Sequence, residues 1–228
     1  MSRPDATYIP AAGRHWRLPL YDLLATLLGA DAARRVLVEQ VAPRPGDRVL
    51  DLGAGTGSLA IELERRHPRG TVIGLDPDPK ALAIARRKAA RAGVSVHFDQ
   101  GFADALPYPD ASFDLVISSF VFHHLSPAVK EAGLGEIRRV LKPGGRFHML
   151  DFAGPATRRT GALARHIHAH PQLHDNAEDR VLGLMRAAGF ADVRVVARRA
   201  ARLTHMCYYA AASATSPVEP PASVQAGR

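Results

Sequence analysis

The segment VLDLGAGTGSLA, residues 49–60, constrains the fold more than any other part of the chain. It reads as a buried strand, a loop with glycine at every second position, and the start of a helix. Glycine in such a loop lets the backbone turn tightly and lets a ligand approach it closely. A loop that joins a strand to a helix in this way is typical of the ligand-binding edge of an α/β sheet.

Strands and helices alternate along the middle of the chain. The apolar runs predict five strands, at residues 48–52, 71–75, 94–98, 113–119 and 146–151. Helical patterns fill three of the intervals, at residues 58–66, 79–91 and 127–141. Because parallel neighbours need a crossover connection, this alternation predicts a doubly wound parallel sheet with helices on both faces.

The region after the fifth strand follows a different pattern. Residues 156–174 are rich in Arg and His, and a periodic helix follows at 176–188. Two closely spaced strands, at 193–198 and 202–210, predict a hairpin. The sheet therefore gains an antiparallel member at its end.

The chain falls into three parts by these patterns. Residues 1–42 carry two short helical patterns, at 20–28 and 31–41, and form an N-terminal helical cap segment. Residues 43–212 hold all the predicted strands and form the domain itself. Residues 213–228 are rich in Ser, Pro and Ala, a composition typical of a disordered tail.

Composition narrows the class of protein to a soluble globular one. The hydrophobic fraction is 46%, and the formal charge of +8 comes mostly from arginines that are scattered along the sequence. Scattered charge predicts a solvated surface and disfavours a nucleic-acid partner. A single cysteine, Cys207, excludes an intrachain disulfide, and no apolar run reaches the roughly 18 residues that span a bilayer. We therefore expect a cytoplasmic protein with no membrane partner.

The glycine spacing excludes two common phosphate ligands. Gly53, Gly55 and Gly57 give G-x-G-x-G, and Ser58 stands where the dinucleotide fingerprint has its third glycine. A P-loop would carry lysine after its last glycine, and this loop does not. The loop therefore predicts a ligand other than a pyrophosphate or a triphosphate.

Two carboxylates flank this loop and describe the ligand. Asp51 ends the first strand, where it would repel a pyrophosphate but attract an ammonium or sulfonium group. Asp76 ends the second strand, at the interval expected of a ribose-binding acid. The alternative for Asp76 is a solvated cap of the helix at 79–91. Together the two residues predict a ligand with a ribose and a cationic amino-acid end.

Four ordered segments carry a resemblance to a known family. They read VLDLGAGTGSLA, GLDPDPKALAIARRKA, LPYPDASFDLVISSFVFHHL and RRVLKPGGRFHMLDF, and they span about residues 47–152. In these segments the chain resembles class I S-adenosylmethionine-dependent methyltransferases, and more narrowly the small-molecule group that includes the ubiquinone/menaquinone biosynthesis enzymes. The resemblance implies a Rossmann-like seven-stranded sheet in the order 3-2-1-4-5-7-6, with strand 7 antiparallel. It also implies S-adenosylmethionine as the cofactor of a methyltransferase domain at residues 43–212.

The resemblance also implies which residues hold the cofactor. They are Asp51, Gly53, Ala54, Gly55, Thr56, Asp76, Pro77, Phe102, Ala103, Ser118 and Ser119. Asp51 and the glycine loop would surround the methionine end, Asp76 the ribose, and Ser119 the transferred methyl group. At Phe102 the chain departs from a common family pattern, because a polar residue there often bonds the adenine amino group. Phe102 would instead pack on the ring, with the Ala103 N–H available to it.

Methyl transfer is an in-line displacement, so the main task of the protein is to align the nucleophile with the methyl group. A base near the acceptor would remove a proton from a phenol, enol or amine nucleophile, and histidine titrates in the right range. His123 and His124, in the segment FVFHHL after the fourth strand, are the candidate catalytic residues. Packing at a strand-to-helix turn is the alternative for both.

A second group of histidines lies beyond the fifth strand. Its members are His166, His168, His170 and His174. Their spacing invites a metal site, but no Cys or acidic ligand completes the set and the displacement needs no metal. No metal is predicted, and the segment is expected to cover the substrate instead.

Three functions stay open at this point. A small-molecule methyltransferase is favoured, although Asp151-Phe152-Ala153 replaces the Glu-x-Ser that ends the quinone-enzyme signature. An RNA or protein methyltransferase would draw on the +8 charge and bind with a steep salt dependence. A non-catalytic protein would bind S-adenosylmethionine without turnover. The acceptor, its reacting atom and the oligomeric state also stay open.

Overall fold

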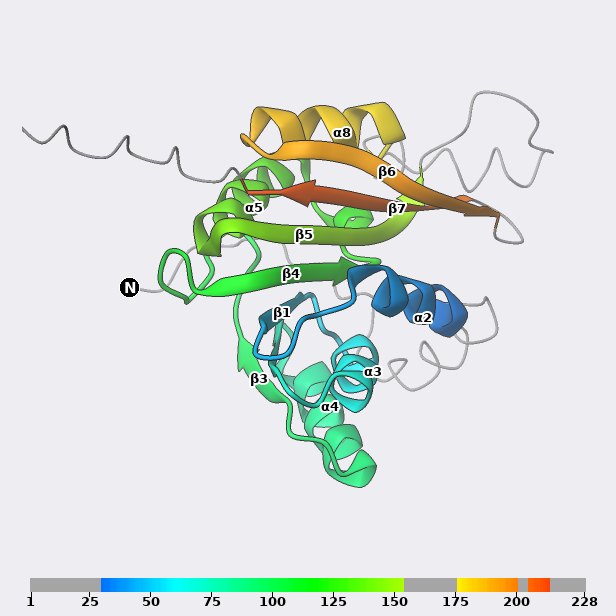
Figure 1. Ribbon diagram of the computed structural model, residues 1–228, viewed down its shortest axis with the longest axis vertical. Coiled ribbons are helices and arrows are strands. Elements are labelled where there is room, and N and C mark those ends of the chain that lie inside the picture. Colours follow the sequence, from blue (N-terminus) through cyan, green and yellow to red (C-terminus); the bar gives the residue numbers. More distant parts are fainter. Residues whose placement is uncertain (1–29, 154–175, 201–204, 214–228) are drawn as a thin grey trace, which may run out of the picture.

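Seven hydrogen-bonded strands form one sheet in the order β3-β2-β1-β4-β5-β7-β6, which confirms the predicted topology (Figure 1). The computed structural model describes residues 30–153, 176–200 and 205–213. The strands are β1 (Arg48–Leu52), β2 (Thr71–Asp76), β3 (His97–Gln100), β4 (Phe113–Ser119), β5 (Leu141–Ala153), β6 (Ala191–Ala200) and β7 (His205–Ala212). The helices are α2 (Ala30–Val41), α3 (Ser58–Arg66), α4 (Pro79–Ala92), the 3-10 helix η2 (Phe122–His124), α5 (Pro127–Val140) and α8 (Glu178–Ala187).

Strand directions follow the predicted pattern. β1 pairs in parallel with β2 and β4, and the parallel series continues to β3 on one side and to β5 on the other. β7 is antiparallel to both β5 and β6, which confirms the predicted hairpin. Because the parallel strands all end at one edge of the sheet, the loops that follow them converge there.

Helices cover both faces of the sheet, as predicted. α2, α3 and α4 pack on one face, and α5 and α8 pack on the other. Side chains of β4 alternate between the two cores: Leu115 and Ile117 lie under α2 and α3, whereas Val116 lies under α5. Burial on both faces explains why this strand is a continuous apolar run.

The third strand begins at His97, three residues later than the sequence predicts. The reason lies at the end of α4, where Gly93 adopts a left-handed conformation with φ of 66°. The Gly93 N–H donates to the Ala90 carbonyl and the Val94 N–H donates to the Ala89 carbonyl, as in a Schellman motif. The Val94 N–H is therefore committed to the helix end and cannot join the sheet.

The fifth strand begins at Leu141, before the turn that the sequence predicts at 142–145. Leu141 pairs with Phe113, and the next pair in the register joins Arg146 to Leu115. Residues 142–145 therefore bulge out of a continuous strand instead of separating a helix from a strand.

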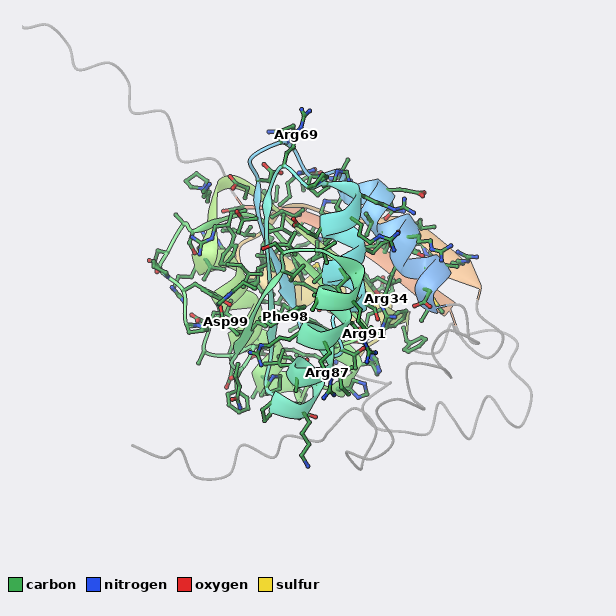
Figure 2. The ribbon with its side chains drawn as sticks, turned by 90° about the horizontal axis from the view of Figure 1, so that it is seen from below. Arg34, Arg69, Arg87, Arg91, Phe98 and Asp99 are labelled. Carbon is green, nitrogen blue, oxygen red and sulfur yellow. The ribbon has the colours of Figure 1, made fainter. Side chains whose placement is uncertain are left out.

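The run ARRKAAR, residues 85–91, lies on α4. Arg87 and Arg91 are exposed on this helix and are labelled in Figure 2. Ala85 and Ala89 on the opposite side are buried in the core. The basic run is thus the exposed face of an amphipathic helix.

Several predictions from the sequence concern residues outside the described ranges. They are the helix at 20–28, the histidine-rich segment 166–174 and the tail beyond Ser213. The helix predicted at 31–41 is α2. Among the described residues, no helix is both long and apolar enough to cross a lipid bilayer.

Candidate functional site

The glycine loop follows β1 at the edge where the parallel strands end. Gly53, Gly55 and Gly57 all have positive φ, at 75°, 54° and 80°. A Cβ atom on Gly53 would lie 2.2 Å from Cγ2 of Val121, so glycine is required there for space as well as for conformation. The N–H groups of Gly53 and Ala54 donate to the Leu75 carbonyl at 2.8 and 3.0 Å, which ties the loop to β2.

Asp76 is buried at the end of β2 and binds the loop directly. Its Oδ2 accepts the Gly55 N–H at 2.8 Å, and its Oδ1 accepts the Asp78 N–H at 2.9 Å. Burial raises the pKa of Asp76, and these two N–H groups lower it in part. The cap of α4 is Asp78, whose Oδ1 accepts the Lys80 N–H at 2.8 Å, so the capping alternative for Asp76 is wrong. Each Asp76 oxygen keeps a lone pair for a ribose hydroxyl.

Asp51 is buried near the end of β1, and no hydrogen bond from a described residue offsets the burial of its carboxylate. Neither carboxylate oxygen has a hydrogen-bond partner in the part of the chain that the structure describes. Burial raises the pKa of Asp51 to about 7, while the nearby Arg34 guanidinium and the dipole of the Ala60 N–H lower it in part. An uncompensated buried carboxylate favours a cationic ligand, which fits the ammonium or sulfonium predicted for this position.

The two serines at the end of β4 have different partners. Ser118 is buried and its hydroxyl donates to the Leu52 carbonyl at 2.9 Å, which joins β4 to β1. The Ser119 hydroxyl accepts from Nε of Arg34 at 3.4 Å. Ser119 therefore faces the same side of the sheet as α2, and Ser118, the residue before it on β4, faces the opposite side.

The predicted adenine wall lies at the ends of β2 and β3. Phe102 is 41% exposed in the loop after β3. The Pro77 carbonyl accepts from Nε2 of Gln100 at 3.1 Å, which holds the two strand ends together. Within the glycine loop, the Thr56 hydroxyl accepts from Nζ of Lys88 at 3.2 Å.

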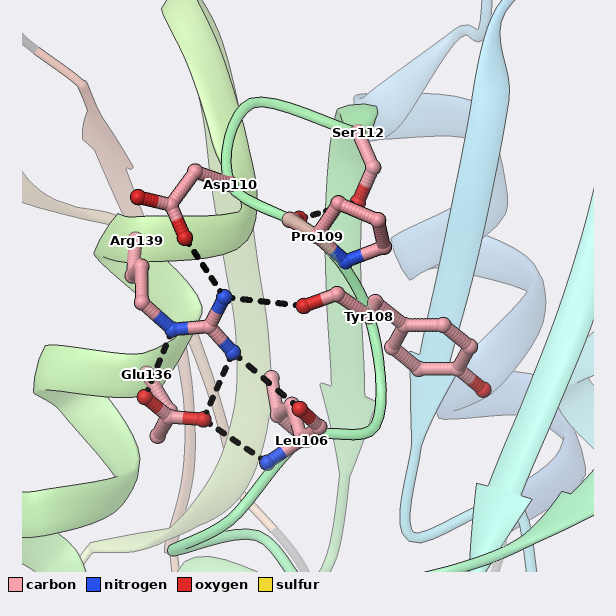
Figure 3. Close-up of polar contacts among 7 residues, drawn as sticks. All are labelled: Leu106, Tyr108, Pro109, Asp110, Ser112, Glu136 and Arg139. Atoms are coloured by element: carbon pink, nitrogen blue, oxygen red, sulfur yellow. Dashed lines mark hydrogen bonds and ion pairs between the residues drawn. The ribbon is translucent and has the colours of Figure 1, made fainter.

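A buttress of hydrogen bonds holds the loop that carries Phe102 (Figure 3). Arg139 on α5 pairs with Glu136, with both pairing distances at 2.8 Å, and with Asp110 at 2.8 Å. It also donates to the carbonyls of Tyr108 and Leu106 at 2.8 and 3.1 Å. No local pattern in the sequence indicates this buttress, because Arg139 lies about 30 residues from Tyr108 and Asp110. One planar guanidinium thus fixes the whole loop against α5.

The two candidate histidines lie in η2, after β4. Nδ1 of His123 lies 2.6 Å from Oδ1 of Asp151, a fully buried carboxylate on β5. The backbone N–H groups of His123 and Phe152 also donate to this carboxylate, at 3.2 and 2.7 Å. The contact to Asp151 fixes the orientation of the His123 ring through Nδ1.

His124 is half-buried, and its ring has different surroundings from that of His123. Its Nε2 has no hydrogen-bond partner among the described residues. Burial and the neighbouring His123 together lower the pKa of His124 to about 4, although Asp151 raises it in part, so the ring is neutral at pH 7. The two rings lie 3.9 Å apart between centroids.

Three residues at this edge were not predicted as site residues. Arg34 reaches Ser119 from α2, Asp151 holds His123, and Phe120 stands between β4 and η2 with φ of 59°. A left-handed phenylalanine is rare and is typical of functional sites. Only Asp151 left a signal in the sequence, as a departure from the quinone-enzyme signature.

The fold and this edge define a Rossmann-like protein that binds a cationic, ribose-bearing ligand without phosphates. Comparison with known proteins agrees with this class. A family model described as a methyltransferase domain matches residues 49–145. The chain is 45% identical over 150 residues to the demethylmenaquinone methyltransferase of Thermus thermophilus, a match that covers 64% of this chain and 67% of that protein.

The demethylmenaquinone methyltransferase of Deinococcus radiodurans is 43% identical over 150 residues, covering 64% of this chain. That match covers 61% of the relative, so the chain spans less than two thirds of its length. The fold matches phosphoethanolamine N-methyltransferase 2 of Haemonchus contortus bound to S-adenosyl-L-methionine, with a TM-score of 0.71 and 16% identity. That alignment covers 90% of this chain and 59% of the other. The chain belongs to the family of S-adenosylmethionine-dependent methyltransferases.

Proposed function

We propose that the chain transfers a methyl group from S-adenosylmethionine to a small-molecule acceptor, and that His123 removes a proton from that acceptor. The observation that carries this proposal is the 2.6 Å contact between Nδ1 of His123 and the buried Asp151 carboxylate. A carboxylate that accepts a hydrogen bond from Nδ1 favours the tautomer with the proton on Nδ1, and in this tautomer Nε2 keeps a lone pair that can accept a proton. It also stabilises the imidazolium that forms when Nε2 takes a proton.

His123 suits the role of base better than His124. The His123 side chain is 12% exposed, so a small acceptor can reach it, and it has an orienting partner in Asp151. The buried Nε2 of His124 has no hydrogen-bond partner among the described residues, and its pKa of about 4 makes it a weak base. We therefore assign proton removal to His123 and packing against the His123 ring to His124.

The cofactor supplies a methyl group that its sulfonium has already activated. We assign the methionine end to Asp51 and the glycine loop, the ribose to Asp76, and the adenine to the wall formed by Pro77 and Phe102. The loop, the strand ends and the buttressed segment would hold the reacting groups in line. Such alignment supplies roughly 7–11 kcal/mol of the barrier reduction in favourable cases.

The acceptor we favour is a reduced demethylated quinone, because two relatives are named demethylmenaquinone methyltransferases. The ring centroids of Phe120 and Phe152 lie 4.9 Å apart, and those of His123 and Phe152 lie 5.1 Å apart. Aromatic side chains therefore surround the His123 ring, where a quinone ring would bind. His123 would take the proton of a ring hydroxyl, and a neighbouring ring carbon would form the bond to the methyl group. The C–S bond breaks with its electron pair on sulfur, and the ring then loses the proton from the methylated carbon.

The remaining parts of the proposal concern the whole chain. We propose that residues 43–212 are the methyltransferase domain, that residues 1–42 cap it and that residues 213–228 are a tail. Support comes from the sheet, which runs from Arg48 in β1 to Ala212 in β7. We also propose that the protein works in the cytoplasm, since its one cysteine is free, and without nucleic acid, since its basic run is the exposed face of an amphipathic helix.

The test measures methyl transfer to reduced demethylmenaquinone with labelled S-adenosylmethionine. Asp151→Asn and His123→Gln should each lower kcat by about 10²- to 10⁴-fold, with the affinity for S-adenosylhomocysteine unchanged. His97→Gln is the matched control, because His97 pairs with Asp99 at 2.9 Å on the exposed end of β3 and should leave kcat unchanged.

The outcomes separate the parts of the proposal. Full activity of Asp151→Asn would show that the pair is structural. Cofactor binding with no transfer to the quinone, but transfer to another metabolite, would replace the acceptor class. Cofactor binding without transfer to any metabolite, RNA or protein would favour the non-catalytic alternative.

A further inference from the structure

Three residues form a row across the last strands of the sheet, at the edge where β5 ends. Phe152 on β5 pairs with Met206 on β7, and Met206 pairs with Arg199 on β6. The three strands lie side by side in Figure 1. Because neighbouring strands are about 4.8 Å apart, the backbone of Arg199 lies roughly 10 Å from that of Phe152. Residues that pair in this way point to the same face of the sheet.

The row belongs to the face of the sheet that carries α2. Met206 is buried in the core under α2, and Phe152 packs against that core. Arg198, the residue before Arg199, points to the other face, where its guanidinium pairs with Glu178 of α8 at 2.8 and 2.5 Å. Because side chains alternate along a strand, Arg199 shares the face of Phe152.

No carboxylate of the described residues balances the positive charge of Arg199. Its side chain is exposed and forms no ion pair within those ranges, although Arg194 and Arg198 on the same strand each pair with an acidic residue. Burial raises the pKa of Tyr208, and the nearby Arg199 lowers it in part. The Tyr208 hydroxyl donates to the Ala33 carbonyl of α2 at 3.1 Å, so it stays in place beside the guanidinium. The remaining N–H groups of Arg199 can therefore bind an oxygen atom of a ligand.

The row also continues the aromatic group around His123. The ring centroids of Phe152 and His123 lie 5.1 Å apart, and those of Phe152 and Phe120 lie 4.9 Å apart. The proposed base is thus beside one end of the row, and the guanidinium of Arg199 is at the other end. An apolar surface with a polar group at each end suits a planar aromatic molecule that carries oxygen atoms on opposite sides.

We propose that Arg199 determines acceptor specificity by donating a hydrogen bond to the second ring oxygen of an aromatic diol, while His123 faces the hydroxyl that loses its proton. The inference rests on the proposed function and adds a residue of β6, which lies outside the matched residues 49–145. Arginine suits this position because it keeps its charge at any working pH and presents several N–H donors in one plane. A ring that is held at both oxygens keeps one orientation toward the methyl group, as an in-line displacement requires.

Selection between related acceptors follows from these two contacts. A monophenol keeps the contact with His123 and loses the one with Arg199, so it should bind more weakly than a para-diol of the same ring size. The difference in affinity should be about 10- to 100-fold, the scale of a hydrogen bond to a charged group. Removal of the guanidinium should abolish this difference and leave the cofactor site unchanged.

The experiment measures the binding of two aromatic compounds by isothermal titration, under reducing conditions and with S-adenosylhomocysteine already bound. 1,4-Dihydroxynaphthalene carries both oxygen atoms, and 1-naphthol carries one. Each is titrated into wild type, Arg199→Met, Arg199→Lys and the control Arg194→Met. Arg194 is exposed on the same strand and pairs with Ala210, which lies four residues along β7 from Met206 and away from the cofactor edge.

The expected pattern is specific to the diol. Arg199→Met should weaken the binding of 1,4-dihydroxynaphthalene by about 10- to 100-fold and leave that of 1-naphthol within about twofold of wild type. Arg199→Lys should recover part of the loss, because it restores a charged donor. Arg194→Met should change the affinity for neither compound, and the affinity for S-adenosylhomocysteine should be the same in all four proteins.

Three other results would overturn the assignment. Equal loss for both compounds in Arg199→Met would show that Arg199 only supports the fold of the site. Full affinity of this variant for the diol would place the guanidinium outside the acceptor site, and so would a wild type that binds the diol no better than 1-naphthol. The proposed function fails separately, when wild type binds the diol but transfers no methyl group from S-adenosylmethionine to reduced demethylmenaquinone.

Discussion

Replacement of Asp51 by asparagine should stabilise the ligand-free protein at neutral pH while it weakens cofactor binding. Asparagine keeps the shape of the side chain and cannot ionise. In the wild type, the fully buried carboxylate must either bind a proton or stay charged without a hydrogen bond among the described residues. The cofactor site would thus be maintained at a cost to stability, as is common for functional groups that are buried without compensation.

The size of the effect follows from the pKa of Asp51. The pKa rises from 3.8 to about 7 on folding, so the folded state binds more protons than the unfolded state between these values. Stability that is present below pH 4 is therefore lost as the pH rises toward 7. At about 1.4 kcal/mol per pH unit, Asp51→Asn should gain about 2 kcal/mol over wild type at pH 5 and about 4 kcal/mol at pH 8.

The assay is urea unfolding of both proteins without cofactor at pH 5, 6, 7 and 8. The difference between the two free energies of unfolding isolates Asp51, because other groups titrate alike in both proteins. His124 and His148 have pKa values lowered to about 4, so each adds stability as the pH rises from 4 to 6.5, and this term cancels. A difference that stays constant from pH 5 to pH 8 would refute the reasoning, since it would show that Asp51 stays charged or meets a partner.

Two further predictions concern the architecture of the site. Arg139→Met should lower the free energy of unfolding by about 1–3 kcal/mol and weaken S-adenosylhomocysteine several-fold, because the loop with Phe102 loses its buttress. Urea unfolding and calorimetry measure both effects, with Arg138→Met as the exposed control, and a change in neither would contradict the buttress. Gly53→Ala should abolish measurable cofactor binding because its Cβ would lie 2.2 Å from Val121. Adding Val121→Ala should recover part of that binding in calorimetry, and no recovery would assign the loss to the positive φ alone.

Most of the fold could be predicted because local pattern and global arrangement agree. The bounds of β1, α3 and β4 match the prediction, since apolar runs, glycine and proline mark their ends directly. The starts of β3 and β5 were wrong for a shared reason. At Val94 and at residues 142–145 the outcome depends on which backbone groups hydrogen-bond to which, and side-chain pattern does not encode that choice.

The site was predictable only where its residues follow a strand directly. Asp51 and Asp76 end β1 and β2, so the topology of parallel strands brings them to one edge. Arg34 is 85 residues from Ser119, and His123 is 28 residues from Asp151. Those contacts depend on how α2 and β5 pack at the edge of the sheet where the parallel strands end, and no local spacing in the sequence predicts them. Tertiary packing, and not a local motif, therefore brings Arg34 and Asp151 to this edge of the sheet.

Three buried aspartates end β1, β2 and β5, and their surroundings differ in a way that separates their roles. Asp76 accepts two backbone N–H groups, and Asp151 accepts two such groups and also contacts the imidazole of His123. Asp51 accepts none within the described residues. A carboxylate that already accepts hydrogen bonds from the protein is suited to bind a neutral hydroxyl or to share a proton with histidine. A buried carboxylate without such hydrogen bonds is stabilised most by a cation. These hydrogen-bond partners support the proposed roles, with the cationic end of the ligand at Asp51, its ribose at Asp76, and proton removal by His123 beside Asp151.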